Sequence, residues 1–158
     1  MVAGYGLCQR TIVPLSAAET KKKEPELSSE LAIKAAVYHE MLVRHREWPT
    51  NGGQLGAFFL ESSPNERTYL QLLFTNWTPR VEVGATNNVQ ITKSNVIDRV
   101  TGKPAKLFWA RVVSQTNRMA QAVGGWHFTP SAGGQFSYQL HFNGTNWRVL
   151  NKKSDVVW

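Results

Sequence analysis

Cysteine is almost absent from this chain of 158 residues, in which Cys8 is the only one. A single cysteine cannot form an intramolecular disulfide, and it cannot supply an all-cysteine metal site. A chain of this length also buries roughly 70% of the surface that its unfolded form exposes, so it needs no disulfide framework. The sequence therefore excludes the small disulfide-stapled class and predicts a protein held together by a packed core.

Long apolar runs are absent as well. No stretch approaches the roughly 18 to 20 apolar residues that cross a bilayer, so the sequence predicts no membrane span. The first segment, MVAGYGLCQRTIVPLSAAE, lacks the basic start and the full apolar stretch of a secretory signal, yet it resembles the end of one whose beginning is missing. Two locations stay open: the cytoplasm if the chain starts as written, and secretion or the periplasm if this segment is a truncated export signal.

Acidic residues are scarce in the last third of the chain. Residues 101–158 contain seven lysines and arginines against one acid, whereas the first 100 residues are nearly balanced. This region therefore carries nearly all of the net charge of +7. The asymmetry favours an acidic partner or an anionic surface. The basic surface predicted from it consists of Lys103, Lys106, Arg111, Arg118, Arg148, Lys152 and Lys153.

The order of segments predicts one folded domain after an N-terminal arm. The charged, proline-interrupted stretch TKKKEPELSS places the arm at residues 1–27 and a single α+β domain at residues 28–158. The stretch SELAIKAAVYHEMLVRHRE carries apolar residues at helical spacing, with Ser29 as the expected N-cap. The motif Ser63-Pro64-Asn65-Glu66 predicts the start of a second, shorter helix.

After Pro79 the apolar period changes from helical to two, which is typical of strands. The expected strands are residues 80–85, 88–100, 105–115, 118–128, 135–142 and 146–153, and LGAFFLE before them is a further short strand. Gly124-Gly125 predicts a bulge or a sharp bend. The pattern as a whole predicts helices packed on one face of an antiparallel sheet of about four to six strands.

The last hairpin, FSYQLHFNGTNWRVLNKK, allows two registers. A two-residue turn pairs Leu140 with Trp147 and Tyr138 with Val149. A four-residue loop instead pairs Phe142 with Trp147 and Leu140 with Val149. In both registers the apolar and aromatic residues share one face, which predicts an aromatic row directed at the core.

This hairpin and the order of elements resemble the cystatin-like and NTF2-like folds, whose final hairpin ends near a G-x-x-W-x-V pattern. The matching residues are Gly144, Trp147 and Val149, preceded by GGQFSYQL and VIDRVTGK, and the resemblance covers residues 28–153. It implies a long helix held in a bent sheet. Families of this fold include steroid isomerases, dehydratases, epoxide hydrolases, transport factors and many small secreted or periplasmic proteins of unknown role. The chain looks most like the last group, which implies binding or assembly ahead of catalysis and no cofactor.

The aromatic content points the same way, because six tryptophans and seven phenylalanines are many for one small core, and exposed aromatics mark contact surfaces. We expect a non-catalytic domain that binds a protein partner, a second copy of itself or a small apolar ligand. The resemblance and the alternation together predict the residues that line its cavity: Tyr38, Phe58, Trp109, Trp126, Tyr138 and Trp147.

A catalytic alternative is a small-molecule isomerase or hydrolase. A general base must be a titratable group directed into an apolar pocket, and the sequence offers Asp98, with His141 and Tyr138 as partners. Asp98-Arg99 resembles the aspartate and arginine of epoxide hydrolases of this fold. The competing interpretation is that Asp98 stabilises the turn at Thr101-Gly102.

A third hypothesis is a binder of single-stranded nucleic acid, because the basic residues of the last third are interspersed with aromatic residues. A metal site is not predicted. His39 and His45 stand six residues apart, which is about 240° around a helix, so they cannot hold one ion together.

Overall fold

The structure is a computed structural model that describes residues 28–46, 54–84, 87–129 and 131–157. In chain order its elements are α1 (Ser29–Arg46), β1 (Ala57–Leu60), α2 (Pro64–Leu73), β2 (Arg80–Val83), β3 (Val89–Ile91), β4 (Val96–Asp98), β5 (Ala105–Gln115), β6 (Met119–Thr129), β7 (Ala132–Phe142) and β8 (Trp147–Val157). The α+β class is confirmed. The expected N-terminal arm, residues 1–27, lies outside the described residues.

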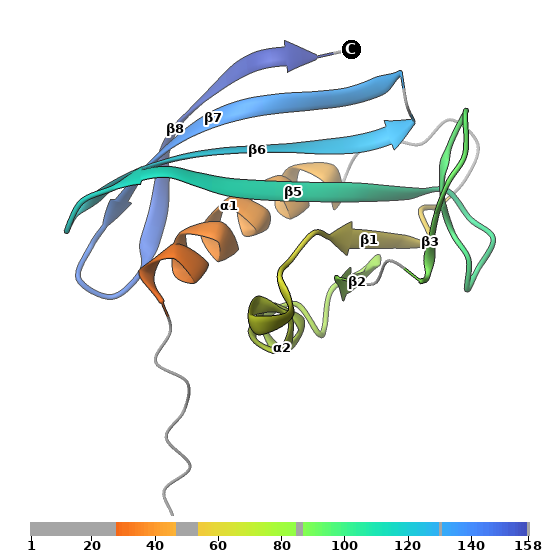
Figure 1. Ribbon diagram of the computed structural model, residues 1–158, viewed down its shortest axis with the longest axis horizontal. Helices are drawn as coiled ribbons and strands as arrows, with labels where there is room; N and C mark the ends of the chain where they lie inside the picture. Colours follow the sequence, from red (N-terminus) through yellow and green to blue (C-terminus); the bar gives the residue numbers. More distant parts are fainter. Residues whose placement is uncertain (1–27, 47–53, 85–86, 130, 158) are drawn as a thin grey trace, which may run out of the picture.

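A six-stranded sheet in the order β2-β1-β5-β6-β7-β8 forms the body of the fold, and β3 and β4 form a separate two-stranded ribbon. Strands β5 to β8 are a meander of long antiparallel strands that passes over α1 (Figure 1). The expected all-antiparallel sheet is wrong, because β1 runs parallel to both β2 and β5. All four residues of β1 are buried, which suits a central strand with both faces covered.

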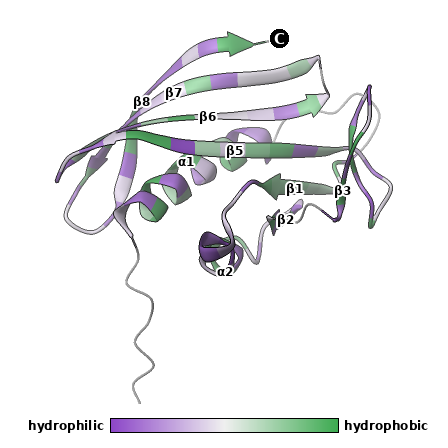
Figure 2. Cartoon of the chain, in the orientation of Figure 1, coloured by the Kyte–Doolittle hydropathy of each residue, from purple (hydrophilic) through white to green (hydrophobic). Residues whose placement is uncertain are grey.

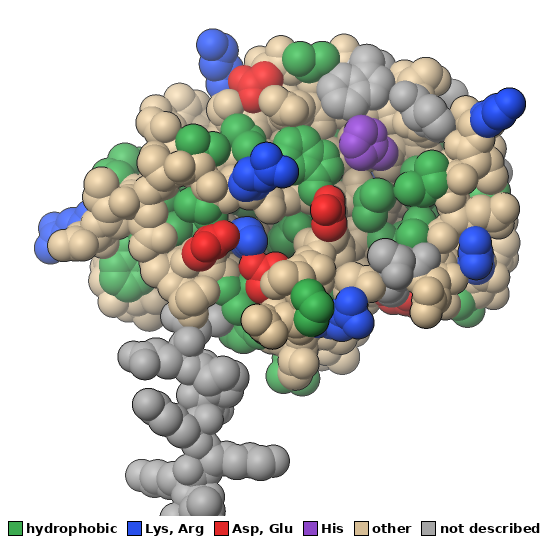
Figure 3. Space-filling view, viewed as in Figure 1, with side chains coloured by type: hydrophobic (Ala, Val, Ile, Leu, Met, Phe, Trp, Pro, Cys, Tyr) green, Lys and Arg blue, Asp and Glu red, His purple; other side chains and the backbone are tan. Residues whose placement is uncertain are grey.

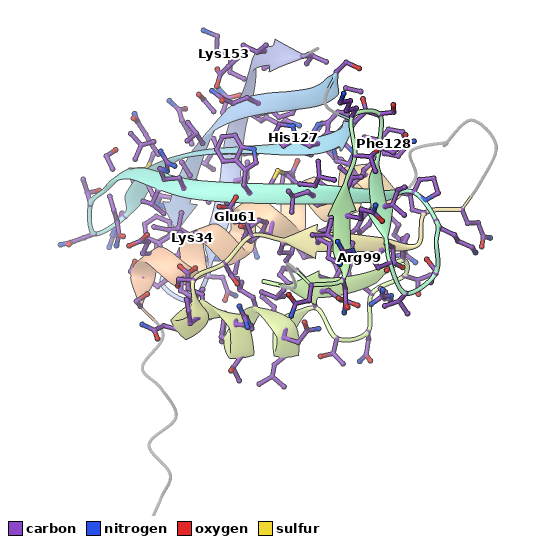
Figure 4. All side chains as sticks on the ribbon, turned by 45° about the vertical axis from the view of Figure 1, so that its right-hand side comes forward. Lys34, Glu61, Arg99, His127, Phe128 and Lys153 are labelled. Carbon is purple, nitrogen blue, oxygen red and sulfur yellow. The ribbon has the colours of Figure 1, made fainter. Side chains whose placement is uncertain are left out.

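The two helices form from local signals in the sequence. In α1 the backbone N–H of Leu31 donates to the Ser28 hydroxyl at 3.2 Å, so Ser28 caps the helix instead of the expected Ser29. In α2 the Glu66 carboxylate accepts a hydrogen bond from the Ser63 N–H at 2.9 Å, as the motif predicts. Lys34 of α1, labelled in Figure 4, joins the two helices through a 2.6 Å ion pair with Glu66.

The expected strand 88–100 is instead the β3–β4 hairpin. Thr92 reverses the chain here, since its hydroxyl accepts from the Asn95 N–H at 2.9 Å and its N–H donates to the Asn95 carbonyl at 2.8 Å. Alternation alone did not reveal this turn, because a threonine side chain makes it without glycine or proline.

The final hairpin adopts the register of the four-residue loop. Phe142 pairs with Trp147 and Leu140 pairs with Val149. The Asn143 side chain closes the loop by accepting hydrogen bonds from the backbone N–H groups of Thr145 and Asn146, at 3.0 and 2.8 Å.

Strand pairing continues through Gly124-Gly125 without a shift of register, so the bulge is wrong, and the sharp bend, the other expected feature, stays a prediction. The glycines are required by close packing on both faces of the sheet. A Cβ at Gly124 would lie 3.1 Å from Val37 of α1, and one at Gly125 would lie 2.9 Å from the Trp109 indole.

The main core fills the space between α1 and the face of the sheet that it covers, which we call the inner face. Figure 2 shows hydrophobic positions along the sheet and along α1. A smaller cluster of Ala57, Phe59, Val96 and Ala105 packs under the β3–β4 ribbon on the outer face. In the described ranges, no helix is long and apolar enough to cross a membrane.

Candidate functional site

Five of the six expected cavity residues belong to the main core: Phe58, Trp126, Tyr138 and Trp147 on the inner face, and Tyr38 on α1, which covers it. Each is at most 8% exposed, so these side chains fill the core. Trp109 does not belong with them, because its indole lies over Gly125 on the outer face. Its neighbour Phe108 occupies the inner face instead, so alternation places Trp109 opposite.

A hollow lies beside this core, between α1, α2 and the β7–β8 hairpin. This groove has a volume of about 710 Å³. Figure 1 shows the β7–β8 loop next to the first turns of α1, and both segments contribute lining residues. Its lining residues are Ser29, Ala32, Ala35, Ala36, His39, Tyr69, Leu73, Asn117, Phe142, Thr145, Asn146, Trp147 and Arg148.

The groove combines apolar walls with a cationic rim. Phe142 and Trp147, with ring centroids 5.5 Å apart, form one wall, and Tyr69 of α2 lines the other side. The alanines of α1 leave the space open, because they carry no side chain beyond Cβ. The described lining contains Arg148 and no aspartate or glutamate, and Arg148 forms no ion pair with a described residue.

A second constellation lies at the other end of α1, and we call it the inner cluster: His45, Lys106, Trp126 and Phe128. The Lys106 amine lies 3.1 Å from Nδ1 of His45, and 5.2 and 5.8 Å from the ring centroids of Trp126 and Phe128. Figure 4 labels Phe128 near the end of β6. Lys106 is only 2% exposed, so its assignment to the basic surface is wrong.

Burial shifts the pKa of both polar groups of the inner cluster. It lowers the pKa of Lys106 to about 8, because an ammonium ion loses hydration in an apolar site. The pKa of His45 falls to about 3, through burial first and then through repulsion from Lys106, Lys152 and Arg44. His45 is therefore neutral at physiological pH.

Charged groups of α1 and β8 border the inner cluster. Arg44 binds Glu40 at 2.6 Å, and the Lys152 amine lies 3.7 Å from the ring centroid of Phe136. Burial and the Arg44 charge lower the pKa of Lys152. The Tyr138 hydroxyl is buried nearby and has no hydrogen-bond partner among the described residues.

Asp98 is buried and hydrogen-bonded by neighbouring side chains. It is fully buried, and its carboxylate accepts hydrogen bonds from Arg80 at 2.6 Å and from the Thr101 hydroxyl at 2.5 Å. Burial opposes its ionisation, but these hydrogen bonds prevail and hold the pKa of Asp98 below its ordinary value. The contact with Thr101 matches the interpretation of Asp98 as the residue that stabilises this turn.

The expected catalytic partners do not share one face. Tyr138 faces the core, whereas His141, three residues further along the same strand, projects to the outer face. No group of three His, Cys, Asp or Glu within the described ranges could hold a metal ion. The remaining basic residues, Lys103, Arg111, Arg118, Arg148, Lys152 and Lys153, come from different strands and loops, and Figure 3 shows the cations of one face scattered among other side chains.

The His45–Lys106 pair was missed in the sequence, although a signal for it was present. Lys106 alternates with Phe108, Ala110 and Val112, which all contact the core, so the strand pattern places Lys106 on the inner face. The charge of Lys106 predicts a surface position, whereas its place in the alternation predicts the inner face.

Comparisons of this chain with protein-family models, with curated proteins and with solved structures found no match to any of them.

Proposed function

We propose that this chain is a non-catalytic binding domain of the NTF2-like or cystatin-like type, whose groove takes a small molecule with an apolar body and one anionic group. The observation that carries the proposal is the groove of about 710 Å³ with aromatic walls and a cationic rim. Small-molecule sites typically span about 300 to 1,000 Å³ and combine apolar walls with a few polar groups that orient the ligand.

The charge of the lining favours an anion. Arg148 shares the outer face with its cross-strand partner His141, so it can donate two parallel hydrogen bonds to a carboxylate only at the edge of the groove. His39 and Asn146 add polar groups to the lining. Tyr69, Phe142 and Trp147 of the same lining offer apolar surface to a chain or ring. A medium-chain fatty acid has both features and serves as the probe.

The test is titration calorimetry with laurate, and with dodecanol as its uncharged counterpart. Ala36→Trp fills the groove from α1, and Thr145→Trp fills it from the hairpin loop, where a folding defect is less expected because Thr145 is exposed. We expect either change to weaken laurate binding at least about tenfold.

Arg148→Gln should weaken laurate binding about tenfold and leave dodecanol binding unchanged, since a hydrogen bond to a charged group contributes about 1.5 to 3 kcal/mol.

Arg111→Gln is the matched control, because Arg111 is an exposed arginine on β5 that does not border the groove. It should bind both probes as the original protein does. Undiminished laurate binding in both tryptophan variants, with folding verified by circular dichroism, would remove the groove as the binding site. A homodimer, the other assembly expected from the sequence, stays a prediction for sedimentation velocity.

A further inference from the structure

The last strand, β8, is an edge of the six-stranded sheet, because β7 is its only partner strand among the described residues. The strand is eleven residues long, and three of its apolar side chains are exposed: Leu150 at 62%, Val156 at 51% and Val157 at 63%. Figure 1 shows β8 at the margin of the sheet, on the side away from β1 and β2. A long edge strand with exposed apolar side chains is a template for pairing with a further strand.

The charged residues of this edge are self-complementary. Lys153, labelled in Figure 4, pairs with Ser137 of β7, so the two side chains share the outer face. The Asp155 carboxylate lies on the same face, because it accepts a hydrogen bond from the Ser137 hydroxyl at 2.7 Å. Both charged residues are exposed, and neither forms an ion pair with a described residue. A cation and an anion therefore flank Ser154 on one face of the edge.

We propose that β8 is a homodimer interface, in which the β8 strands of two copies of this chain pair antiparallel about a two-fold axis at Ser154. This axis places Ser154 opposite its own copy. It also places Lys153 of each copy opposite Asp155 of the other, so the contact contains two ion pairs. The interface is isologous, because both copies contribute the same residues, and the two sheets join into one continuous sheet.

Charge selects this register over its neighbours. An axis at Lys153 would bring two ammonium groups opposite each other, and an axis at Asp155 would bring two carboxylates opposite each other. Like charges directly opposite on paired strands are destabilising. A lysine on an edge strand ordinarily opposes pairing, and here Asp155 removes that opposition in a single register.

The β-bulge near the axis limits the strength of the contact. Gln135 pairs with Val156 and Phe136 pairs with Ser154, so Asp155 is the extra residue of this bulge. A bulge increases the local twist and thereby shortens the stretch over which a second strand can pair. We therefore expect a small interface, below roughly 1,200 Å², and a dissociation constant on the order of micromolar or weaker.

The first experiment exchanges the charges and follows self-association of the full chain by sedimentation velocity. Lys153→Glu and Asp155→Lys each place like charges opposite each other twice, so each variant alone should self-associate at least about tenfold more weakly than the original protein. An equal mixture of the two variants should recover the original affinity. In the mixed dimer both positions of each chain again meet the opposite charge.

Arg111→Glu is the matched control for Lys153→Glu. Arg111 is an exposed residue of β5 in the same cross-strand row, which runs through Val123 and Ser137 to Lys153. It lies three strands in from the edge, so this variant should self-associate as the original protein does. Circular dichroism verifies the folding of each variant.

The second experiment traps the two-fold contact with a disulfide. Residues opposite each other on antiparallel strands have Cα atoms about 4.5 to 5.5 Å apart, which is within the range of roughly 4.4 to 6.8 Å that a disulfide spans. Ser154→Cys in a Cys8→Ser background should therefore form a covalent dimer on oxidation. Gln139→Cys in the same background is the control, because Gln139 is exposed on β7, one strand in from the edge, and it should stay monomeric.

Four results would overturn the proposal. The first is an original protein that stays monomeric at roughly 1 mM, far above the expected dissociation constant. The second is self-association that both charge variants retain, which would place the contact elsewhere. The third is a mixture that associates as weakly as its components, and the fourth is a disulfide yield for Ser154→Cys no greater than that for Gln139→Cys.

Discussion

The Nζ atom of Lys106 lies 3.1 Å from Nδ1 of His45, a contact that joins β5 to the last turn of α1 across 61 residues of sequence. Both groups are buried, so a positive charge on either loses hydration, and simultaneous charge on both adds repulsion. The structure resolves this conflict by keeping His45 neutral. The stability of the fold should therefore depend on pH through this pair.

The first prediction concerns the stability of the fold at acidic pH. The pKa of His45 is about 3 in the folded protein and about 6.5 in the unfolded chain, so the unfolded state binds the proton between these values. Stability should fall as the pH drops below 6.5, by up to about 1.4 kcal/mol per unit. Urea unfolding at pH 6.5 and pH 5, a range in which carboxylates titrate little, measures the slope. His45→Gln should flatten it, whereas His39→Gln, on an exposed position of the same helix, should leave it unchanged.

The second prediction concerns the stability of the fold at alkaline pH. Because the pKa of Lys106 is about 8 in the folded state and about 10.5 in the unfolded state, the unfolded chain binds the proton in this window, and stability should rise as the pH increases through it. Lys106→Met removes the buried ammonium, so the variant should gain about 1 to 3 kcal/mol at pH 7 and lose the dependence on pH. Lys103→Met is the exposed control and should show neither effect. A destabilised Lys106→Met protein at pH 7 would contradict this account.

Local signals in the sequence were sufficient for much of this fold. The capping motif placed the start of α2, and strict alternation placed β5 at its observed bounds, residues 105–115. The hairpin register stayed open between two turns, and the Asn143 side chain decides it through two hydrogen bonds that alternation does not encode.

Long-range packing accounts for what the sequence did not reveal. The apolar run AFFL fits a buried strand. Its composition does not reveal which two strands will flank it, or whether they run parallel or antiparallel to it. Trp109 was expected in the cavity from the alternation and the resemblance, yet the space above Gly125 holds its indole on the outer face. Lys106 was expected at the surface because it is charged.

The third prediction separates steric from conformational roles of glycine. Gly125→Ala would place a Cβ 2.5 Å from the Gly134 carbonyl oxygen and 2.9 Å from the Trp109 ring, so neighbouring strands must shift, and we expect a loss of about 2 to 4 kcal/mol. Gly144→Ala meets no atom within 4 Å, but its φ of +98° is unfavourable for alanine, at a cost of about 1 to 2 kcal/mol. Thermal unfolding of the two variants side by side checks the order. Equal losses would mean that the sheet relaxes around Gly125.

The last prediction distinguishes a structural from a catalytic Asp98. Its carboxylate is fully buried and binds both Arg80 and the Thr101 hydroxyl, so Asp98→Ala leaves the Arg80 guanidinium without this partner. We expect a loss of about 1 to 3 kcal/mol in urea unfolding, because the Thr101 hydroxyl and the Val100 N–H lose their acceptor, whereas Arg80 is 36% exposed and keeps its ion pair with Glu82. Since hydrogen bonds hold the pKa of Asp98 below its ordinary value, the stabilisation that the carboxylate provides is present above the ordinary pKa and is lost as the pH falls through the lowered pKa of the folded state.

Asp155→Ala, which removes an exposed carboxylate bound to Ser137, should change stability by less than about 1 kcal/mol. A catalytic aspartate would behave in the opposite way, because its replacement would leave stability nearly unchanged, and that result would return Asp98 to the list of candidate bases.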